Sequence, residues 1–477
     1  MDAWLQFAIE YIGDWLEFQV RSSQQPGCII AIAHRGKIVS ERAFGHADLG
    51  TGEKLTPRHR FRIASHSKAF TAAGIMKLRE RRKLKLDDPV GQHVKGLHPQ
   101  IAEATVAQLL SHSSGLTRDG IDSGQFIDSR PYLNRTELLA ELQRPAAIEP
   151  NTRFKYSNHG FGVLGLVIEA IANEPYPAWI QREIVDALDL RETTPDMPLT
   201  GKAVRFARGH SAELPAGRRL TIPGDNPTHA IMPAAGFVST AADTARFFGQ
   251  LAPNAKGSVL SVASRREMTR KQWQVPQTIE EAYYGFALMS GQTAGWDWFG
   301  HGGGFQGYIS RTCVIPDCDI AVSILTNSID GWAPAWVNGV MHILRAFVTR
   351  GAPKRRVRDW VGRWWTIWGA VDLLPMGNQV IVANPHLINP FLDATEIEIT
   401  GRDRGRIASA PGYASHGEPV RRSRDKAGTV TDVWLGGIQR KPEKILAAKV
   451  TRKYSPRKRS RAQARPAAPR EQAPEAD

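Results

Sequence analysis

The spacing of apolar residues predicts that the chain begins with a helix followed by a β-hairpin. Between positions 2 and 20, apolar residues recur at intervals of three and four, which indicates an amphipathic helix. Its polar face is acidic, which favours docking on the body of the protein over binding to a membrane surface. Two apolar runs, 28–33 and 38–44, flank Arg35-Gly36, a pattern typical of a β-hairpin.

Helical patterns dominate the middle of the chain, and strands return after it. The predicted helices cover 65–83, 109–116, 136–143 and 161–172, and Pro- and Gly-rich loops lie near 195–235. The predicted strands cover 284–289, 296–299, 308–315 and 320–326. A helix over 332–348 closes this first unit, which has strands at both ends and helices between them. The pattern predicts an α+β fold for residues 1–350.

Two further segments follow the first unit. Residues 351–356 are typical of a linker, and residues 357–440 show short alternating runs broken by Gly, Pro and Asn. We therefore expect a small β-rich domain over 357–440. After about residue 449 the chain consists of Arg, Lys, Ala, Pro and Gln with almost no large apolar side chain, so 449–477 is predicted to be a disordered basic tail.

The net charge depends strongly on that tail. The 477 residues include 62 Lys+Arg and 47 Asp+Glu, a formal charge of +15. Residues 440–477 alone carry 12 basic and four acidic residues, so the rest of the chain is only mildly basic. This distribution predicts weak polyanion binding through the tail and no specific nucleic-acid partner.

Composition also limits the compartment and the type of site. No run of 18 apolar residues predicts a membrane span, and the acidic N-terminus lacks the features of a signal or transit peptide, so we expect a cytoplasmic protein. The three cysteines form no CxxC pair, and the histidines are scattered. Neither a disulfide scaffold nor a metal site is predicted, and no cofactor is expected.

The first candidate for chemistry is Ser65-His66-Ser67-Lys68, at the start of an apolar helix. Residues at i and i+3 share one helix face, so Lys68 can reach Ser65. A lysine buried by such a helix has a lowered pKa and can accept the serine proton. The same S-x-x-K spacing occurs at Ser423 and at Ser455, but those stretches lie in a polar turn and in the tail, where no pocket is expected.

The second candidate is Tyr156-Ser157-Asn158, which precedes a glycine-rich apolar helix. A phenol beside an ammonium group can shuttle a proton, and an amide can bind a substrate carbonyl. A second Y-x-N spacing, Tyr132-Leu133-Asn134, stands in a loop without such a helix, so we favour Tyr156.

The third candidate is His301-Gly302-Gly303-Gly304, between the strand that ends at Phe299 and the strand that begins near Tyr308. Glycines let another backbone approach closely and pair with a strand edge. The imidazole offers a donor or a proton at the mouth of a pocket. Taken alone, this element is better interpreted as a flexible hairpin loop with an incidental histidine.

Taken in the order S-x-x-K, Y-x-N, H-x-G, the three elements resemble the serine β-lactamase and penicillin-binding-protein superfamily, and within it the class C-like branch of esterases, D-peptidases and D-aminopeptidases. Residues 109–116, 233–240 and 300–308 also look family-like. The resemblance covers about residues 20–350. It implies the transpeptidase fold of that superfamily, an antiparallel sheet flanked by helices with a mostly helical subdomain. The small β domain resembles the one appended to some D-aminopeptidase-type members.

The resemblance also implies roles for individual residues. Ser65 is expected to be the acylated nucleophile, Lys68 its base and Tyr156 the proton shuttle. The backbone N–H groups of Ser65 and Gly304 would form the oxyanion hole, where one donor is typically worth about 10²–10³ in rate. Substrate binding is implied for Asn158, His301 and Gly303.

Departures from the better-known pattern bear on the substrate. Class A enzymes carry S-D-N and K-T-G as second and third motifs, and this chain has Tyr156-Ser157-Asn158 and His301-Gly302-Gly303 instead. Losing the third-motif lysine removes a fixed charge that would grip a substrate carboxylate. The pattern therefore favours a hydrolase for D-amino-acid-type amides, peptides or esters, with a small-molecule or peptide substrate. A β-lactamase or a D-Ala-D-Ala carboxypeptidase of the same fold is the alternative.

Other classes fit less well. An α/β-hydrolase needs a G-x-S-x-G elbow and a zinc hydrolase needs H-E-x-x-H, and neither motif occurs. A catalytically silent scaffold, or a polyanion-binding protein acting through the tail, is the non-enzyme alternative. The sequence leaves the oligomeric state open.

Overall fold

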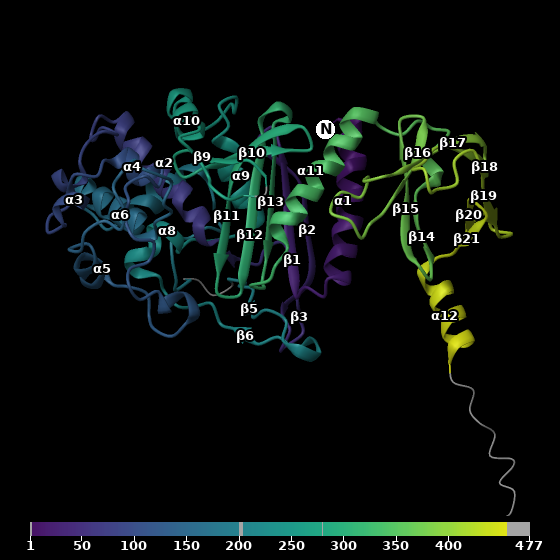
Figure 1. Ribbon diagram of the computed structural model, residues 1–477, viewed down its shortest axis with the longest axis horizontal. Helices are drawn as coiled ribbons and strands as arrows, with labels where there is room; N and C mark the ends of the chain where they lie inside the picture. Colours follow the sequence, from purple (N-terminus) through teal and green to yellow (C-terminus); the bar gives the residue numbers. More distant parts are fainter. Residues whose placement is uncertain (1, 200–203, 279, 456–477) are drawn as a thin grey trace, which may run out of the picture.

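The structure is a computed structural model that describes residues 2–199, 204–278 and 280–455. Three regions lie side by side in it: a mostly helical region, a large antiparallel sheet, and a second sheet near the C-terminal end (Figure 1). The expected α+β arrangement followed by a small β-rich unit is confirmed.

The large sheet has nine strands in the described residues, in the order β3-β2-β1-β13-β12-β11-β10-β9-β8. Strands β1 and β13 are neighbours within the sheet, with Cys28 opposite Thr326, so segments from the two ends of this unit of the sequence are hydrogen-bonded to each other. The strands are β1 (Gly27–His34), β2 (Lys37–Asp48), β3 (Glu53–Lys54), β8 (Trp273–Gln274), β9 (Ala282–Tyr284), β10 (Met289–Thr293), β11 (Trp296–Phe305), β12 (Tyr308–Ile315) and β13 (Ile320–Thr326).

Both faces of this sheet are covered, which explains the continuous apolar run of β1. Ile29 and Ala31 point into the core shared with the helical region, while Ile30 and Ile32 point into a second core with α1 (Ala3–Ser22) and α11 (Ala333–Arg350). Every residue of β1 is buried, as expected for a strand between two covering layers.

The helical region lies on the face of the sheet opposite α1 and α11. Its helices are α2 (Ser67–Glu80), α3 (Pro99–Ala102), α4 (Val106–Leu110), α5 (Arg135–Glu141), α6 (Asn158–Ala172), α7 (Tyr176–Ile180), α8 (Met232–Ala235), α9 (Ala241–Gln250) and α10 (Val262–Thr269). Two short strand pairs accompany them: β4 (Phe61–Arg62) with β7 (Val238–Ser239), and β5 (Gly209–His210) with β6 (Thr221–Ile222).

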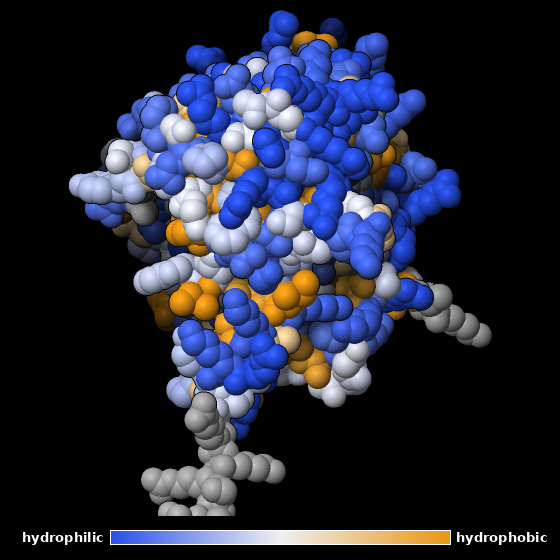
Figure 2. All heavy atoms as spheres, turned by 90° about the vertical axis from the view of Figure 1, so that its right-hand side faces the viewer, coloured by the Kyte–Doolittle hydropathy of each residue, from blue (hydrophilic) through white to orange (hydrophobic). Residues whose placement is uncertain are grey.

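The C-terminal sheet closes on itself like a barrel, because Trp365 in its first strand exchanges two backbone hydrogen bonds with Lys441 after its last. It packs on α1, where the Trp15 indole donates to the Leu387 carbonyl at 3.3 Å. Its outer face is mostly hydrophilic, with smaller hydrophobic patches (Figure 2). The strands are β14 (Gly362–Thr366), β15 (Gly369–Met376), β16 (Gln379–Ala383), β17 (Thr395–Gly401), β18 (Arg404–Ser409), β19 (Pro419–Arg424), β20 (Val430–Leu435) and β21 (Ile438–Arg440).

Two predicted elements differ from the structure in their extent. The helix predicted over 109–116 ends at Leu110, because His112 adopts a left-handed conformation (φ 57°) and its carbonyl accepts from the Lys155 N–H at 2.7 Å. The strand predicted over 284–289 is instead a turn between β9 and β10, closed by a hydrogen bond from the Gly285 N–H to the Leu288 carbonyl.

Two segments predicted to lack regular structure are ordered. His301 through Gly304, expected in a loop, belong to β11, because β12 pairs with that strand along its whole second half. The tail prediction was wrong for residues 449–454, which lie in helix α12 (Glu443–Tyr454). The remainder of that prediction, 456–477, falls outside the described residues. Within the part that the structure describes, no helix is long and apolar enough to cross a membrane.

Candidate active site

Ser65 lies in a tight helical turn at the edge of the helical region. The short strand β4 leads into the 3₁₀ turn Ala64–His66, which continues directly as α2. Ala64 has a left-handed backbone (φ 48°), a conformation that costs an L-residue roughly 1–3 kcal/mol and is often found at functional sites. Ser65 is half-buried, whereas Ala64 and His66 on either side of it are buried. In this first turn, backbone N–H groups have no acceptor within the helix.

Lys68 is fully buried directly behind Ser65. Its ammonium nitrogen lies 3.1 Å from Ser65 Oγ, 2.7 Å from Asn158 Oδ1 and 2.9 Å from the Ala234 carbonyl oxygen. None of these three partners carries a charge. Burial therefore lowers the pKa of Lys68 well below its usual value, although the Asp119 carboxylate opposes that shift.

Asn158 connects Lys68 to Asp119. Its amide nitrogen donates to Asp119 Oδ1 at 2.6 Å, and because a carboxylate only accepts, this bond fixes the amide oxygen toward Lys68. A neutral Lys68 then donates its two N–H groups to Asn158 and Ala234 and directs its lone pair at Ser65 Oγ. The arrangement can hold an amine base in contact with the serine hydroxyl.

Tyr156 lies beside Lys68, which in turn contacts Ser65. Burial raises the pKa of the Tyr156 hydroxyl, although the neighbouring Ser65 side chain opposes that shift, so the phenol is held neutral. Lys68 Nζ lies 4.7 Å from the centre of the Tyr156 ring, and the His112 ring packs against it at 4.1 Å. Ser65, Lys68, Tyr156 and Asn158 are therefore brought together as the sequence predicted.

His301 is buried rather than open at the mouth of the site. Its Nδ1 donates to the Gly302 carbonyl at 2.6 Å, so in the neutral tautomer Nε2 accepts from the Tyr284 hydroxyl at 3.0 Å. Burial, helped by the nearby His66 and Lys68, lowers the pKa of His301 well below its usual value. Both ring nitrogens are occupied and the imidazole is neutral.

The glycines after His301 form a strand that has only one partner. Strand β10 pairs with β11 as far as Gly300, while β12 continues to pair with it as far as Phe305. At Gly303 a Cβ atom would come within 2.2 Å of the Ile63 carbonyl oxygen, so only glycine lets this strand lie against the turn that holds Ser65. In the described residues, 301–305 therefore form an unpaired edge beside Ser65.

Three contributors were not anticipated: Asp119, His112 and Tyr284. Asp119 comes from the loop after residue 116 and has no motif of its own. His112 lies in a family-like stretch, and its Nδ1 accepts from the Ser157 N–H at 3.1 Å. Tyr284 positions His301. Ring packing on Tyr156 identifies His112 and Tyr284, and the bond from Asn158 identifies Asp119; one sequence carries no signal of these contacts.

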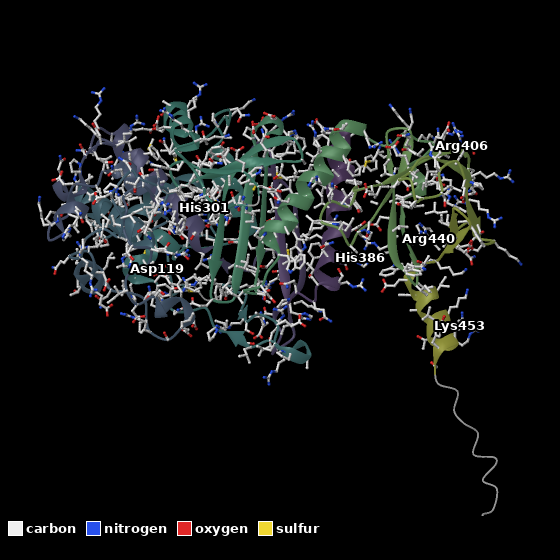
Figure 3. All side chains as sticks on the ribbon, viewed as in Figure 1. Asp119, His301, His386, Arg406, Arg440 and Lys453 are labelled. Carbon is white, nitrogen blue, oxygen red and sulfur yellow. The ribbon has the colours of Figure 1, made fainter. Side chains whose placement is uncertain are left out.

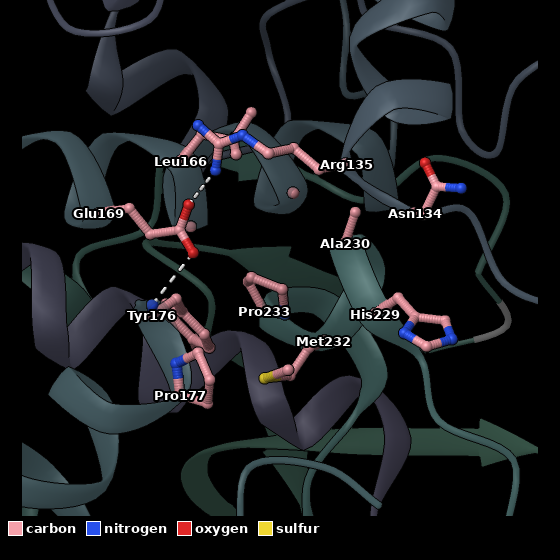
Figure 4. Close-up of a pocket in the computed structure, with 12 residues that line it drawn as sticks. Asn134, Arg135, Leu166, Glu169, Tyr176, Pro177, His229, Ala230, Met232 and Pro233 are labelled. Atoms are coloured by element: carbon pink, nitrogen blue, oxygen red, sulfur yellow. Dashed lines mark hydrogen bonds and ion pairs between the residues drawn. The ribbon is translucent and has the colours of Figure 1, made fainter. Parts of the chain in front are cut away.

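A separate cavity of about 270 Å³ lies behind α8. Its lining includes Met232 and Pro233 of α8, and Glu169 bonds both Arg135 and the Tyr176 N–H at its wall (Figure 4). Ser65, Lys68 and Tyr156 are not among its lining residues, so this cavity is not the site built around Ser65.

A family model described as Beta-lactamase matches residues 14–334. Protein flp of Staphylococcus aureus (strain MW2) is 29% identical over 186 residues, which cover 38% of this chain and 36% of that protein. The match thus spans little more than a third of the length of this relative.

Solved structures extend the likeness to most of the chain. A penicillin-binding protein homologue from Pyrococcus abyssi, described as octameric, covers 91% of this chain and 99% of its own, with a TM-score of 0.64 and 23% identity. A D-amino acid amidase from Ochrobactrum anthropi SV3, complexed with L-phenylalanine amide, covers 72% and 97%, with a TM-score of 0.61 and 23% identity. At these identities the match establishes a shared fold.

Proposed function

The chain belongs to the beta-lactamase family, and from that premise we propose that it is an acyl-serine hydrolase with Ser65 as nucleophile and Lys68 as base. The observation that carries the proposal is the contact between a buried lysine of lowered pKa and Ser65 Oγ, in a setting where its other two partners only accept hydrogen bonds. A neutral amine so placed is a general base for the hydroxyl.

In the acylation step, the Lys68 lone pair takes the Ser65 proton as Oγ attacks the substrate carbonyl. The N–H groups of Ser65 and Gly304 receive the developing oxyanion. Tyr156, which lies beside Lys68, passes a proton to the leaving amine or alcohol and is reprotonated from Lys68, which leaves an acyl-Ser65 ester and a neutral lysine. Water then attacks the ester with the same groups acting in reverse.

Amide, peptide or ester substrates of the D-amino-acid type fit the site best. The neutral His301 offers no fixed charge on the strand wall, and the glycine edge of β11 can pair with an extended substrate backbone. The fold shared with a D-amino acid amidase supports this class. For β-lactam or D-Ala-D-Ala carboxypeptidase activity, the support is the family match itself.

A fluorescent fluorophosphonate tests the nucleophile. We expect it to label the native protein and to spare Ser65→Ala. Ser423→Ala is the matched control, because Ser423 has the same S-x-x-K spacing but lies in β19, where its hydroxyl donates to Asp432 at 3.1 Å. Equal labelling of Ser65→Ala and the native protein would refute the assignment. A panel of D-amino-acid amides, p-nitrophenyl esters and a chromogenic cephalosporin then ranks the substrate classes.

A further inference from the structure

The two walls of the site differ in charge. On the strand wall, His301 is buried and neutral. On the opposite wall, Arg118 extends from the loop that follows α4, and its side chain is 66% exposed. Lys68 is fully buried, so of these two cations only Arg118 is open to solvent.

The position of Arg118 is fixed by the residues that build the site. Its carbonyl accepts the Asn158 N–H at 2.9 Å, which ties it to the start of α6. Its guanidinium carbon lies 5.4 Å from the centre of the Tyr156 ring, and Lys68, which contacts Ser65, lies 4.7 Å from the same centre. A group held by Arg118 would therefore lie beside Tyr156 and the start of α6.

The guanidinium has hydrogen-bond donors to spare. Its Nε donates to Asp119 Oδ2 at 3.0 Å, and across residues 2–199, 204–278 and 280–455 its side chain makes no other hydrogen bond. A guanidinium has five donors, and its two terminal amino groups form a planar fork that matches a carboxylate. The bond to Asp119 orients that fork without using it.

Asp119 is not available to bind a substrate ammonium group. It is 8% exposed, and its two oxygens already accept from Asn158 and Arg118. The electrostatics on this wall thus favour a negative group on the substrate over a positive one.

We propose that Arg118 binds a carboxylate of the substrate, so that the preferred amides, peptides or esters carry a free carboxylate beside Tyr156 and Asn158. Arg118, on the helical wall, would then bind the carboxylate in place of a lysine on the strand. This inference rests on the proposed function of Ser65.

The test uses the full chain and two matched substrate pairs at low salt: mono-p-nitrophenyl glutarate against p-nitrophenyl valerate, and D-alanyl-D-alanine against its C-terminal amide. We expect the native protein to prefer the charged member of at least one pair by about 10- to 100-fold in kcat/KM, the range of a charge-assisted hydrogen-bonded pair. Arg118→Gln should remove that preference, mainly through KM, and Arg118→Lys should keep part of it.

Arg191→Gln is the control for net charge, because Arg191 is a surface residue whose one ion pair among the described residues is with Asp189. The proposal is overturned if the native protein prefers neither charged member, or if Arg118→Gln lowers kcat/KM equally for charged and neutral members, which would assign Arg118 to positioning Asp119. Failure of the proposed function itself is separate and would appear as fluorophosphonate labelling that survives Ser65→Ala.

Discussion

The site around Ser65 and the C-terminal barrel each bury a cation, and they treat it in opposite ways. In the barrel, Arg422 is 2% exposed and lies 3.0 Å from carboxylate oxygens of both Asp359 and Asp403. In the site, Lys68 is fully buried and contacts three uncharged oxygens, and its nearest acid, Asp119, is reached only through Asn158.

The difference separates a structural cation from a reactive one. A guanidinium paired with carboxylates stays protonated at any working pH and holds strands together. An amine without a directly paired carboxylate loses its proton more easily, because burial disfavours the charged form. Burial alone therefore does not make a cation easy to deprotonate; at Lys68 it acts on an amine that no carboxylate contacts.

The largest expected effect is on kcat, which should depend on Lys68 and not on Arg422. Lys68→Ala should lower kcat by about 10²–10⁴-fold, the range for loss of an acid–base group, with the fold retained by circular dichroism. Arg422→Ala should leave kcat unchanged and lower the free energy of unfolding by about 1–3 kcal/mol, because Asp359 and Asp403 each lose one of their two arginine partners, Arg422 and Arg424. Near-native turnover of Lys68→Ala, or inactive Arg422→Ala, would break the comparison.

Replacing one glycine in each region should give a smaller effect: loss of activity in the site and loss of stability alone in the barrel. In Gly303→Ala the new Cβ would meet the Ile63 carbonyl oxygen at 2.2 Å, pushing β11 off the turn that holds Ser65, and kcat should fall at least about 10-fold. In the barrel, Gly405→Ala would meet the Glu398 carbonyl oxygen at 2.8 Å and should lower the melting temperature alone.

Gly302→Ala is the matched control on the same strand, since its Cβ would find nothing nearer than 3.5 Å. Steady-state kinetics and thermal denaturation of the three variants decide the matter. If Gly302→Ala and Gly303→Ala lose activity equally, close packing against Ile63 is not what the site requires.

The smallest expected effect is a shift in pH dependence. Activity that needs neutral Lys68 is present above the pKa of that amine and is lost as the pH falls through it. The Asp119 carboxylate stabilises the protonated amine, so Asp119→Asn should lower the pKa of Lys68 further. The acid limb of kcat/KM, measured with a neutral ester, should then move to lower pH by about half to one unit.

In the barrel, Asp359→Asn should leave the limb where it is, because Arg422 does not titrate in this range. A limb that stays in place in Asp119→Asn would show that another group than Lys68 sets the acid side of the profile.

Local patterns were enough to predict most of the fold. Strands β12 and β13 were predicted with the bounds they have, because a short polar turn separates two apolar runs. The element boundaries that were predicted wrongly depend on distant partners. The helix that includes Leu109 ends where the Lys155 N–H bonds the His112 carbonyl, and the glycines at 302–304 form a strand because β12 pairs with them.

The candidate site shows the same division. Ser65 and Lys68 are three residues apart on one helix, so helical spacing alone predicts their contact. Asp119 lies 39 positions from Asn158, in a loop without a pattern, and only the folded chain brings the two together. The prediction that Asn158 binds the substrate remains a prediction, while its contacts with Lys68 and Asp119 were not foreseen.

The half-paired strand β11 also bears on aggregation. An unpaired strand edge invites the edge of another molecule, a common start of aggregation. Here the end of that edge is covered, because Gln306 in the β11–β12 turn bonds the Gln125 carbonyl and the Tyr132 hydroxyl of the opposite loop. His301 and Asp119 stand within this end of the molecule, far from the basic α12 (Figure 3). Shortening the loop 120–132 should therefore expose this edge of β11 and cause aggregation, measured as turbidity at micromolar protein concentration.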